Sequence, residues 1–135
     1  MLKQRTILYL CTVSVVLLVI MAVVMSSAKT VSVDELNDAL FAACENGNVE
    51  EVRRLLAQGA DVNSTPKGPF SETPLMRAAS QGQVHVVEEL ILRGVDVNAR
   101  SWRGVTALMK AAWWSNDAKA LEVLLDHGAE WNWVL

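Results

Sequence analysis

Two pairs of adjacent carboxylates are the residues of this sequence that most resemble catalytic groups. Glu50 is followed by Glu51, and Glu88 is followed by Glu89. Two carboxyl groups can divide the roles of general acid and general base when their surroundings separate their pKa values. Both pairs lie on predicted helices at positions that face water, where charged side chains are usually solvated. We therefore predict a solvated helix face rather than an acid–base site.

The two histidines do not form a constellation with any other group. His85 and His127 belong to different segments of the chain, and His85 takes an outward position between Val84 and Val86. We expect His85 to be a solvated helix residue. The glycines fall at helix ends and in loops, so they do not build a phosphate-binding loop. The sequence predicts no enzyme, no metal site and no cofactor.

The two cysteines cannot form a disulfide within one folded domain. Cys11 lies in an apolar run near the N-terminus and Cys44 lies in the polar remainder of the chain. Cys44 takes the position that Ala79 and Ala112 hold in related segments, a small core position. No cation is placed to activate its thiol. We predict a buried structural thiol, in a domain that packing alone must stabilise.

Two adjacent tryptophans need an explanation of another kind. Trp113 and Trp114 lie in the segment "TALMKAAWWSND", which reads as a short helix. Neighbouring residues on a helix point about 100° apart, so the two indoles cannot both face one core. At least one of them must be exposed, cover an open end or contact a partner.

Internal repetition is the strongest signal in the sequence. Residues 40–63 read "LFAACENGNVEEVRRLLAQGADVN", residues 75–98 read "LMRAASQGQVHVVEELILRGVDVN" and residues 108–132 read "LMKAAWWSNDAKALEVLLDHGAEWN". The starts are 35 and then 33 residues apart. Each repeat predicts two short helices that cannot bury their apolar faces alone, so the repeats must stack.

Local signals place the helices of each repeat. Thr73 can cap the first helix of the second repeat, Pro74 suits its first turn, and Gly82 separates it from the second helix. Gly59, Gly94 and Gly128 are expected to end the second helices in a left-handed conformation. The predicted apolar stripes of the second helices are Val49, Val52, Leu55 and Leu56; Val84, Val87, Leu90 and Ile91; and Ala118, Leu121, Leu124 and Leu125.

With "TPLMRAA", "GADVN" and the 33-residue spacing, the chain resembles the ankyrin repeat family over about residues 34–132. The resemblance implies an all-α solenoid of helix–turn–helix repeats with short β-hairpin fingers. Repeats are expected at about 34–65, 70–100 and 103–133, within a domain of residues 29–135. Met76 and Met109 replace the family's usual histidine. The first repeat begins instead with the capping box Ser32-Val-Asp-Glu35.

The resemblance also implies where a partner would bind, because ankyrin domains usually use the finger tips and the concave face of the first helices. These positions hold aromatic residues and arginines, which are enriched at interface hot spots. The expected partner-binding residues are Phe70, Glu72, Arg77, Gln81, Trp102, Arg103, Val105, Lys110, Trp113 and Trp114.

The tryptophans also admit a structural interpretation. All five lie in or after the finger of the third repeat, where the stack ends. We expect Trp131 and Trp133, with Val134 and Leu135, to cover the last helices as a substitute cap. For Trp113 and Trp114, partner contact and a capping role both remain open.

The N-terminal segment is predicted to meet a membrane. Residues 7–25 carry no charge, and Lys3 and Arg5 precede them. A helix of this length nearly spans a hydrocarbon core of about 30 Å. Residues 1–28 are therefore an uncleaved anchor or a signal sequence cleaved after Ala28, with small residues at Ser26 and Ala28. Either way, the positive-inside bias keeps the N-terminus cytoplasmic and exports the repeats, for example to a bacterial periplasm.

Charge and repeats together define two functional hypotheses. From Lys29 onward the chain holds 10 Lys and Arg against 15 Asp and Glu, a net charge of −5, which argues against a nucleic-acid surface. The favoured hypothesis is a non-catalytic, membrane-tethered protein–protein interaction module outside the cytoplasm. The alternative is an inhibitor or immunity-type protein that blocks a specific exported enzyme or toxin through the same surface.

Overall fold

The computed structural model describes residues 2–27 and 30–131, and these contain seven helices and no strand. The chain divides into two compact units, Met1–Val31 and Ser32–Leu135. The first unit holds a single helix and the second unit holds the other six.

Helix α1 (Leu2–Ser27) makes up the first unit. Its segment Lys3–Met25 is long and apolar enough to cross a membrane or to act as a signal sequence. At 1.5 Å per residue this segment is about 35 Å long, against a hydrocarbon core of about 30 Å. All side chains from residue 3 to residue 25 are exposed.

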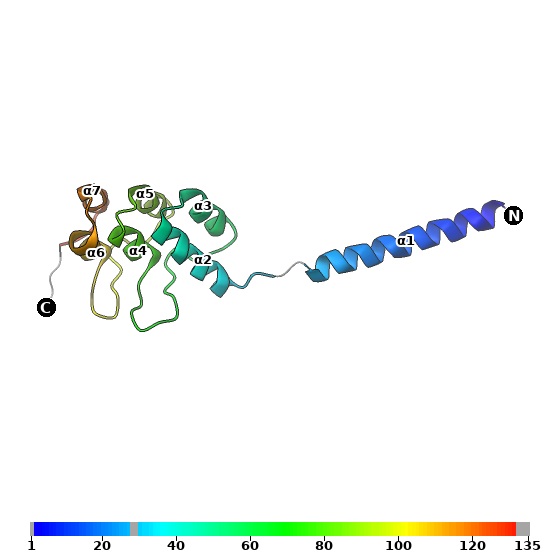
Figure 1. Ribbon diagram of the computed structural model, residues 1–135, viewed down its shortest axis with the longest axis horizontal. Coiled ribbons are helices and arrows are strands. Elements are labelled where there is room, and N and C mark those ends of the chain that lie inside the picture. Colours follow the sequence, from blue (N-terminus) through cyan, green and yellow to red (C-terminus); the bar gives the residue numbers. More distant parts are fainter. Residues whose placement is uncertain (1, 28–29, 132–135) are drawn as a thin grey trace. The chain divides into compact units, whose positions relative to one another are not determined.

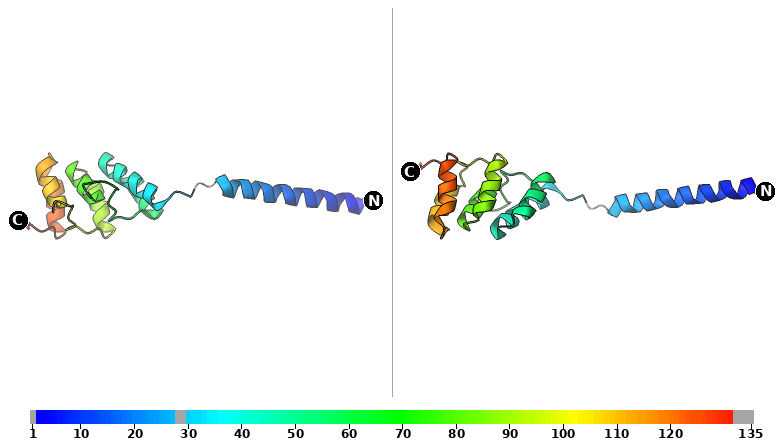
Figure 2. Two further views of the ribbon diagram at one scale, coloured as in Figure 1. Left: turned by 90° about the horizontal axis from the view of Figure 1, so that it is seen from below. Right: turned by 90° about the horizontal axis from the view of Figure 1, so that it is seen from above.

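The second unit consists of three helix pairs. The pairs are α2 (Val33–Asn46) with α3 (Val49–Ala57), α4 (Pro74–Ser80) with α5 (Val84–Leu92), and α6 (Ala107–Trp114) with α7 (Ala118–Asp126). Helices α2, α4 and α6 lie side by side in an inner layer, and α3, α5 and α7 form an outer layer (Figures 1 and 2). Successive pairs therefore stack as repeats of one unit.

Two long loops, which we call the fingers, join the pairs and extend beyond the inner layer (Figure 1). The first finger is residues 58–73 and the second finger is residues 93–106. In the second finger the Ser101 N–H donates to the Val105 carbonyl at 2.9 Å. Neither finger contains an assigned strand in the part of the chain that the structure describes, so the expected β-hairpins are not confirmed.

The predicted caps fix the inner helices. The hydroxyl of Thr73 accepts a hydrogen bond from the Met76 N–H at 3.2 Å. The hydroxyl of Thr106 accepts one from the Met109 N–H at 3.3 Å. These caps form although methionine replaces the family's histidine, because the hydrogen bond uses the backbone N–H of that residue and not its side chain. Ser32 opens α2 with the expected capping box.

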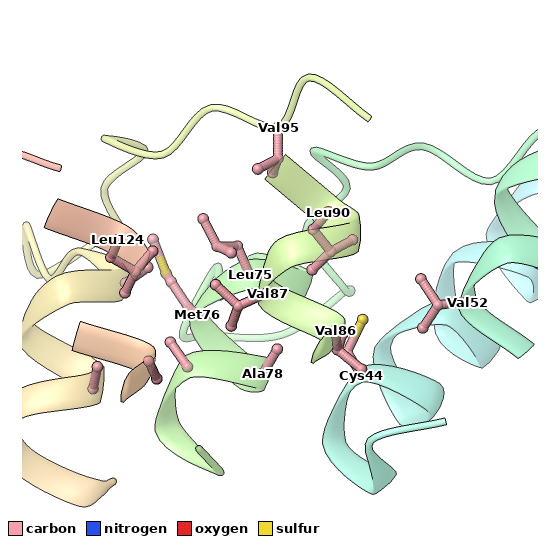
Figure 3. Close-up of a cluster of buried hydrophobic side chains, with 14 of the residues drawn as sticks. Cys44, Val52, Leu75, Met76, Ala78, Val86, Val87, Leu90, Val95 and Leu124 are labelled. Atoms are coloured by element: carbon pink, nitrogen blue, oxygen red, sulfur yellow. The ribbon is translucent and has the colours of Figure 1, made fainter. Parts of the chain in front are cut away.

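The core runs through all three pairs, between the two layers. Its fully buried side chains come from every repeat, as the close-up shows for the second and its neighbours (Figure 3). Leu90 and Val87, predicted as core, are 0 % exposed. The residues of the three predicted apolar stripes are buried or half-buried, except Ala118, which is exposed. This supports the predicted assignment of which helix face is turned to the core. The largest fully buried residues are Leu40, Leu75, Met76, Leu90, Leu108, Leu124, Val52, Val86, Val87, Pro74 and Cys44.

Contact between repeats buries residues that lie outside the predicted stripes. Val86 is 1 % exposed and Ala120 is 0 % exposed. Helix α5, which carries Val86, contacts α3 of the preceding pair and α7 of the following pair. Each outer helix thus packs on a neighbouring repeat as well as on its own partner, so its buried face is wider than one stripe. Ala112, predicted as a small core residue, is instead exposed, because no described helix packs beyond α6.

The asparagine that closes each of the first two repeats links that repeat to the next one. Asn63 Oδ1 accepts the N–H of Asp96 at 2.9 Å. Asn98 Oδ1 accepts the N–H of Glu130 at 2.9 Å. An asparagine side chain thereby satisfies a loop backbone donor of the neighbouring repeat. This shared role explains why the sequence repeats the residue.

Glu89 does not face water as the sequence predicted, which corrects that interpretation of the second carboxylate pair. Its side chain is 7 % exposed and lies between two guanidinium groups. Arg53 of α3 and Arg93 at the end of α5 each donate from Nε at 3.0 Å. The hydrogen bond from Arg53 is the main cause that lowers the pKa of Glu89, although its burial opposes this. Glu89 therefore joins two repeats as a carboxylate.

Candidate functional site

An open groove lies along the fingers and the inner helices. Its volume is about 770 Å³. Both fingers and helices α2, α4 and α6 contribute side chains, so all three repeats build it. Its lining residues are Phe41, Pro66, Gly68, Phe70, Ser71, Glu72, Arg77, Ser101, Trp102, Arg103, Val105, Lys110, Trp113 and Trp114. We call this the finger groove.

Nine of the ten residues that the sequence singled out for partner contact line the finger groove. The exception is Gln81, which follows α4 and is exposed outside the groove. The structure adds residues that the sequence analysis missed, above all Phe41 of α2. Phe41 holds the position of Met76 and Met109 in the repeat, so an alignment of the three repeats shows an aromatic residue at this position only in the first.

Large aromatic side chains of the groove remain open to solvent. Phe70, Trp102, Trp113 and Trp114 are 51–58 % exposed. Trp113 and Trp114 contact each other edge to face, with ring centroids 5.4 Å apart. Both indoles therefore lie on the groove side of α6 although they are adjacent in the sequence. They are not covered as core residues would be.

The backbone of the first finger sets the orientation of two groove side chains. Ser71 has a φ of +44°, a left-handed conformation that is uncommon for a residue other than glycine. It separates Phe70 from Glu72. Phe70 is exposed at the groove, whereas the side chain of Glu72 is only 15 % exposed. The sharp turn thus presents an apolar ring and turns the carboxylate inward.

Each of the three cations in the groove lies over an aromatic ring. The guanidinium of Arg77 lies 4.8 Å from the Phe41 ring centroid. That of Arg103 lies 4.6 Å from the Trp102 centroid. The ammonium of Lys110 lies 4.6 Å from the Trp114 centroid. Such contacts hold long side chains against the groove wall, where they would otherwise sample many rotamers.

Glu72 is the one carboxylate among the residues that line the groove. Arg77 Nη2 of α4 forms an ion pair with one of its oxygens at 3.1 Å, and Lys110 of α6 pairs with the other oxygen. The first finger is therefore held to two successive repeats. Arg77 Nε is buried and has no hydrogen-bond partner in the structure. A buried donor without an acceptor costs free energy.

The remaining reactive residue types are placed as structural groups. Cys44 is fully buried, and burial raises the pKa of its thiol to about 12, which keeps the thiol protonated. His85 is exposed and faces Glu88 at 3.3 Å. Among the described residues, no three His, Cys, Asp or Glu side chains are grouped so that they could hold a metal ion. Trp131, which was expected to help cover the last helices, is 54 % exposed. The other expected members of this cap, Trp133, Val134 and Leu135, lie outside the described residues.

Comparison with known proteins agrees with the stacked helix pairs. The family model described as ankyrin repeats (3 copies) matches residues 17–101 and 40–133. No curated protein matches the chain. Ankyrin repeats indicate a protein–protein interaction module, and the family is generally non-catalytic. With three helix pairs, capped inner helices and two fingers in one stack, the chain belongs to the ankyrin repeat family.

Proposed function

We propose that this chain binds a partner protein in the finger groove and that α1 holds the module at a membrane, with the repeats outside the cytoplasm. The observation that carries the proposal is the exposure of three tryptophans and one phenylalanine around a single open groove. Each such ring can bury about 150–250 Å². Apolar surface of this extent, gathered at one site, is typical of a binding surface.

The groove also meets the requirements of a preorganised surface. Its aromatic rings carry cations on their faces, and its one carboxylate is held by two of them. Side chains fixed before binding lose less conformational entropy when a partner docks. Tryptophan and arginine, which dominate binding energy at interfaces, occur here together.

The membrane part of the proposal rests on the first unit. The 23 residues Lys3–Met25 expose apolar side chains along a continuous helix, a surface that water disfavours and a bilayer accommodates. Lys3 and Arg5 precede the apolar run and favour a cytoplasmic N-terminus. The alternative cleavage site after Ala28 lies outside the described residues.

Reporter fusions test this topology. Alkaline phosphatase fused after Leu135 should be active in a bacterial host, because this enzyme requires export to fold. A fluorescent protein that matures only in the cytoplasm should be dark at the same point. The reverse pattern would overturn the proposed location. The intact mass of the purified protein separates an anchor from a cleaved signal sequence.

Substitution of the adjacent tryptophans tests the groove. The double variant Trp113→Ala/Trp114→Ala should lose the proteins that the full chain captures from solubilised membranes of its own source. Trp131→Ala is the matched control, since it removes an equally exposed indole that does not line the groove. The thermal midpoints of all three chains should be close. A double variant that is folded and still captures the same proteins would overturn the proposal, and so would one that unfolds.

A further inference from the structure

We infer that the finger groove takes an acidic, extended segment of its partner that also carries an apolar residue. The inference rests on the proposed function and adds the chemistry of the partner. It depends on three features of the groove: its charge, the positions of its cations and its size.

The groove differs in charge from the rest of the second unit. Residues 32–135 contain nine Lys and Arg and fifteen Asp and Glu, a net charge of −6. The groove is lined by three of those cations and one of those carboxylates, so its net charge is +2. The remaining six cations and fourteen carboxylates give the rest of the unit a charge of −8. An acidic segment is therefore attracted to the groove and repelled elsewhere, which fixes where it docks.

The positions of the cations exclude the opposite chemistry. An exposed indole face would ordinarily attract a lysine or arginine of a partner. Here Arg103 and Lys110 of this chain already lie over Trp102 and Trp114. A basic segment would approach these like charges, so the arrangement selects against it.

One cationic group in the groove is open to an acidic side chain of a partner. Arg103 is exposed on the second finger and forms no ion pair among the described residues. Arg77 and Lys110 instead share Glu72. A partner carboxylate at Arg103 would form a charge-assisted hydrogen bond.

The size and the apolar walls define the rest of the segment. A groove of about 770 Å³ is comparable to a small-molecule pocket, so it admits a few residues of an extended chain and no folded domain. Phe70, Val105 and Trp113 add apolar side chains to the same lining. A segment that carries carboxylates and an apolar residue matches this mixed surface.

Selection from a library of random 12-residue peptides tests the inference with the full chain in zwitterionic nanodiscs. Retained peptides should be richer in Asp and Glu than the starting library and should share an apolar residue. Binding of a retained peptide should weaken as salt rises from 50 to 500 mM, because the attraction is screened. The variant Arg103→Glu should weaken it by about tenfold. Arg100→Glu, an exposed charge on the same finger outside the groove, should change it less than about twofold.

The outcomes separate the inference from the proposed function. Neutral or basic peptides whose binding is lost in Trp113→Ala/Trp114→Ala would overturn the acidic chemistry and leave the groove as the binding surface. Equal effects of Arg103→Glu and Arg100→Glu would overturn it as well. If no retained peptide depends on the groove tryptophans, the proposed function itself fails.

Discussion

Glu89 in the outer layer and Glu72 beside the inner layer are each held by two cations, but their surroundings differ. Glu89 lies between Arg53 and Arg93, whose side chains are 49 % and 43 % exposed. Glu72 lies between Arg77 and Lys110, which are 31 % and 16 % exposed and rest on aromatic rings. The first cluster therefore meets water on its outer side. The second lines an open groove.

This difference shows which feature of a charge cluster marks a binding surface. Both clusters join neighbouring repeats, so both contribute to the stack. Only Glu72 is accompanied by exposed aromatic rings, a buried donor without an acceptor and open volume. A carboxylate between two cations is by itself a structural group. We expect substitutions in the outer layer to change stability and substitutions in the groove to change binding.

The largest expected effect is a loss of stability at Leu90 of α5. Leu90 is 0 % exposed, so Leu90→Ala leaves a cavity between the layers and should lower the free energy of unfolding by about 2–5 kcal/mol. A domain of this size has about 5–15 kcal/mol in total. Thermal unfolding of the full chain in detergent, followed by circular dichroism, measures the change.

Leu92→Ala is the matched control on the same helix. Leu92 is 80 % exposed, so its truncation should leave the midpoint nearly unchanged. Groove peptides should still bind the folded fraction of both variants. If Leu90→Ala and Leu92→Ala melt alike, the assignment of stability to the interior between the layers is wrong.

The repeat pattern allowed most of the fold to be predicted. Recurring leucines, helix-ending glycines and the closing asparagine are local signals at fixed spacing, and they led to three stacked helix pairs. The groove residues could be predicted because each lies on a finger or directly before or after the "AA" of an inner helix. These positions follow from repeat register, and nine of the ten chosen residues meet in one groove.

The errors arise where a contact spans two repeats. Glu89 was predicted to face water because periodicity within one helix does not show Arg53, which lies 36 residues earlier. Val86 was left out of the buried stripe for the same reason. Ala112 was predicted as core by analogy with Cys44, but no described helix covers it. Neighbour contacts in a stack depend on the position of the repeat as well as on its own sequence.

A smaller effect is expected from Glu89→Gln, which sharpens the comparison because it keeps the volume and removes the charge. The freed guanidiniums of Arg53 and Arg93 are partly exposed and can be hydrated, so the loss should be about 1 kcal/mol at pH 7. Glu88→Gln, on the neighbouring residue whose side chain is 50 % exposed, should have little effect.

The pH dependence of that difference identifies its cause. The fold lowers the pKa of Glu89 from its usual 4.5, so its contribution is present above pH 4.5 and is lost as the pH falls through the lowered value. The thermal midpoints of the parent and Glu89→Gln should therefore differ at pH 7 and converge as the pH falls below that value. A gap that persists after Glu89 itself has become protonated would mean that packing, and not the carboxylate charge, holds α3 against α5. Glu89 would then not act as a charged link between repeats, and only Glu72 would remain as a carboxylate whose charge matters.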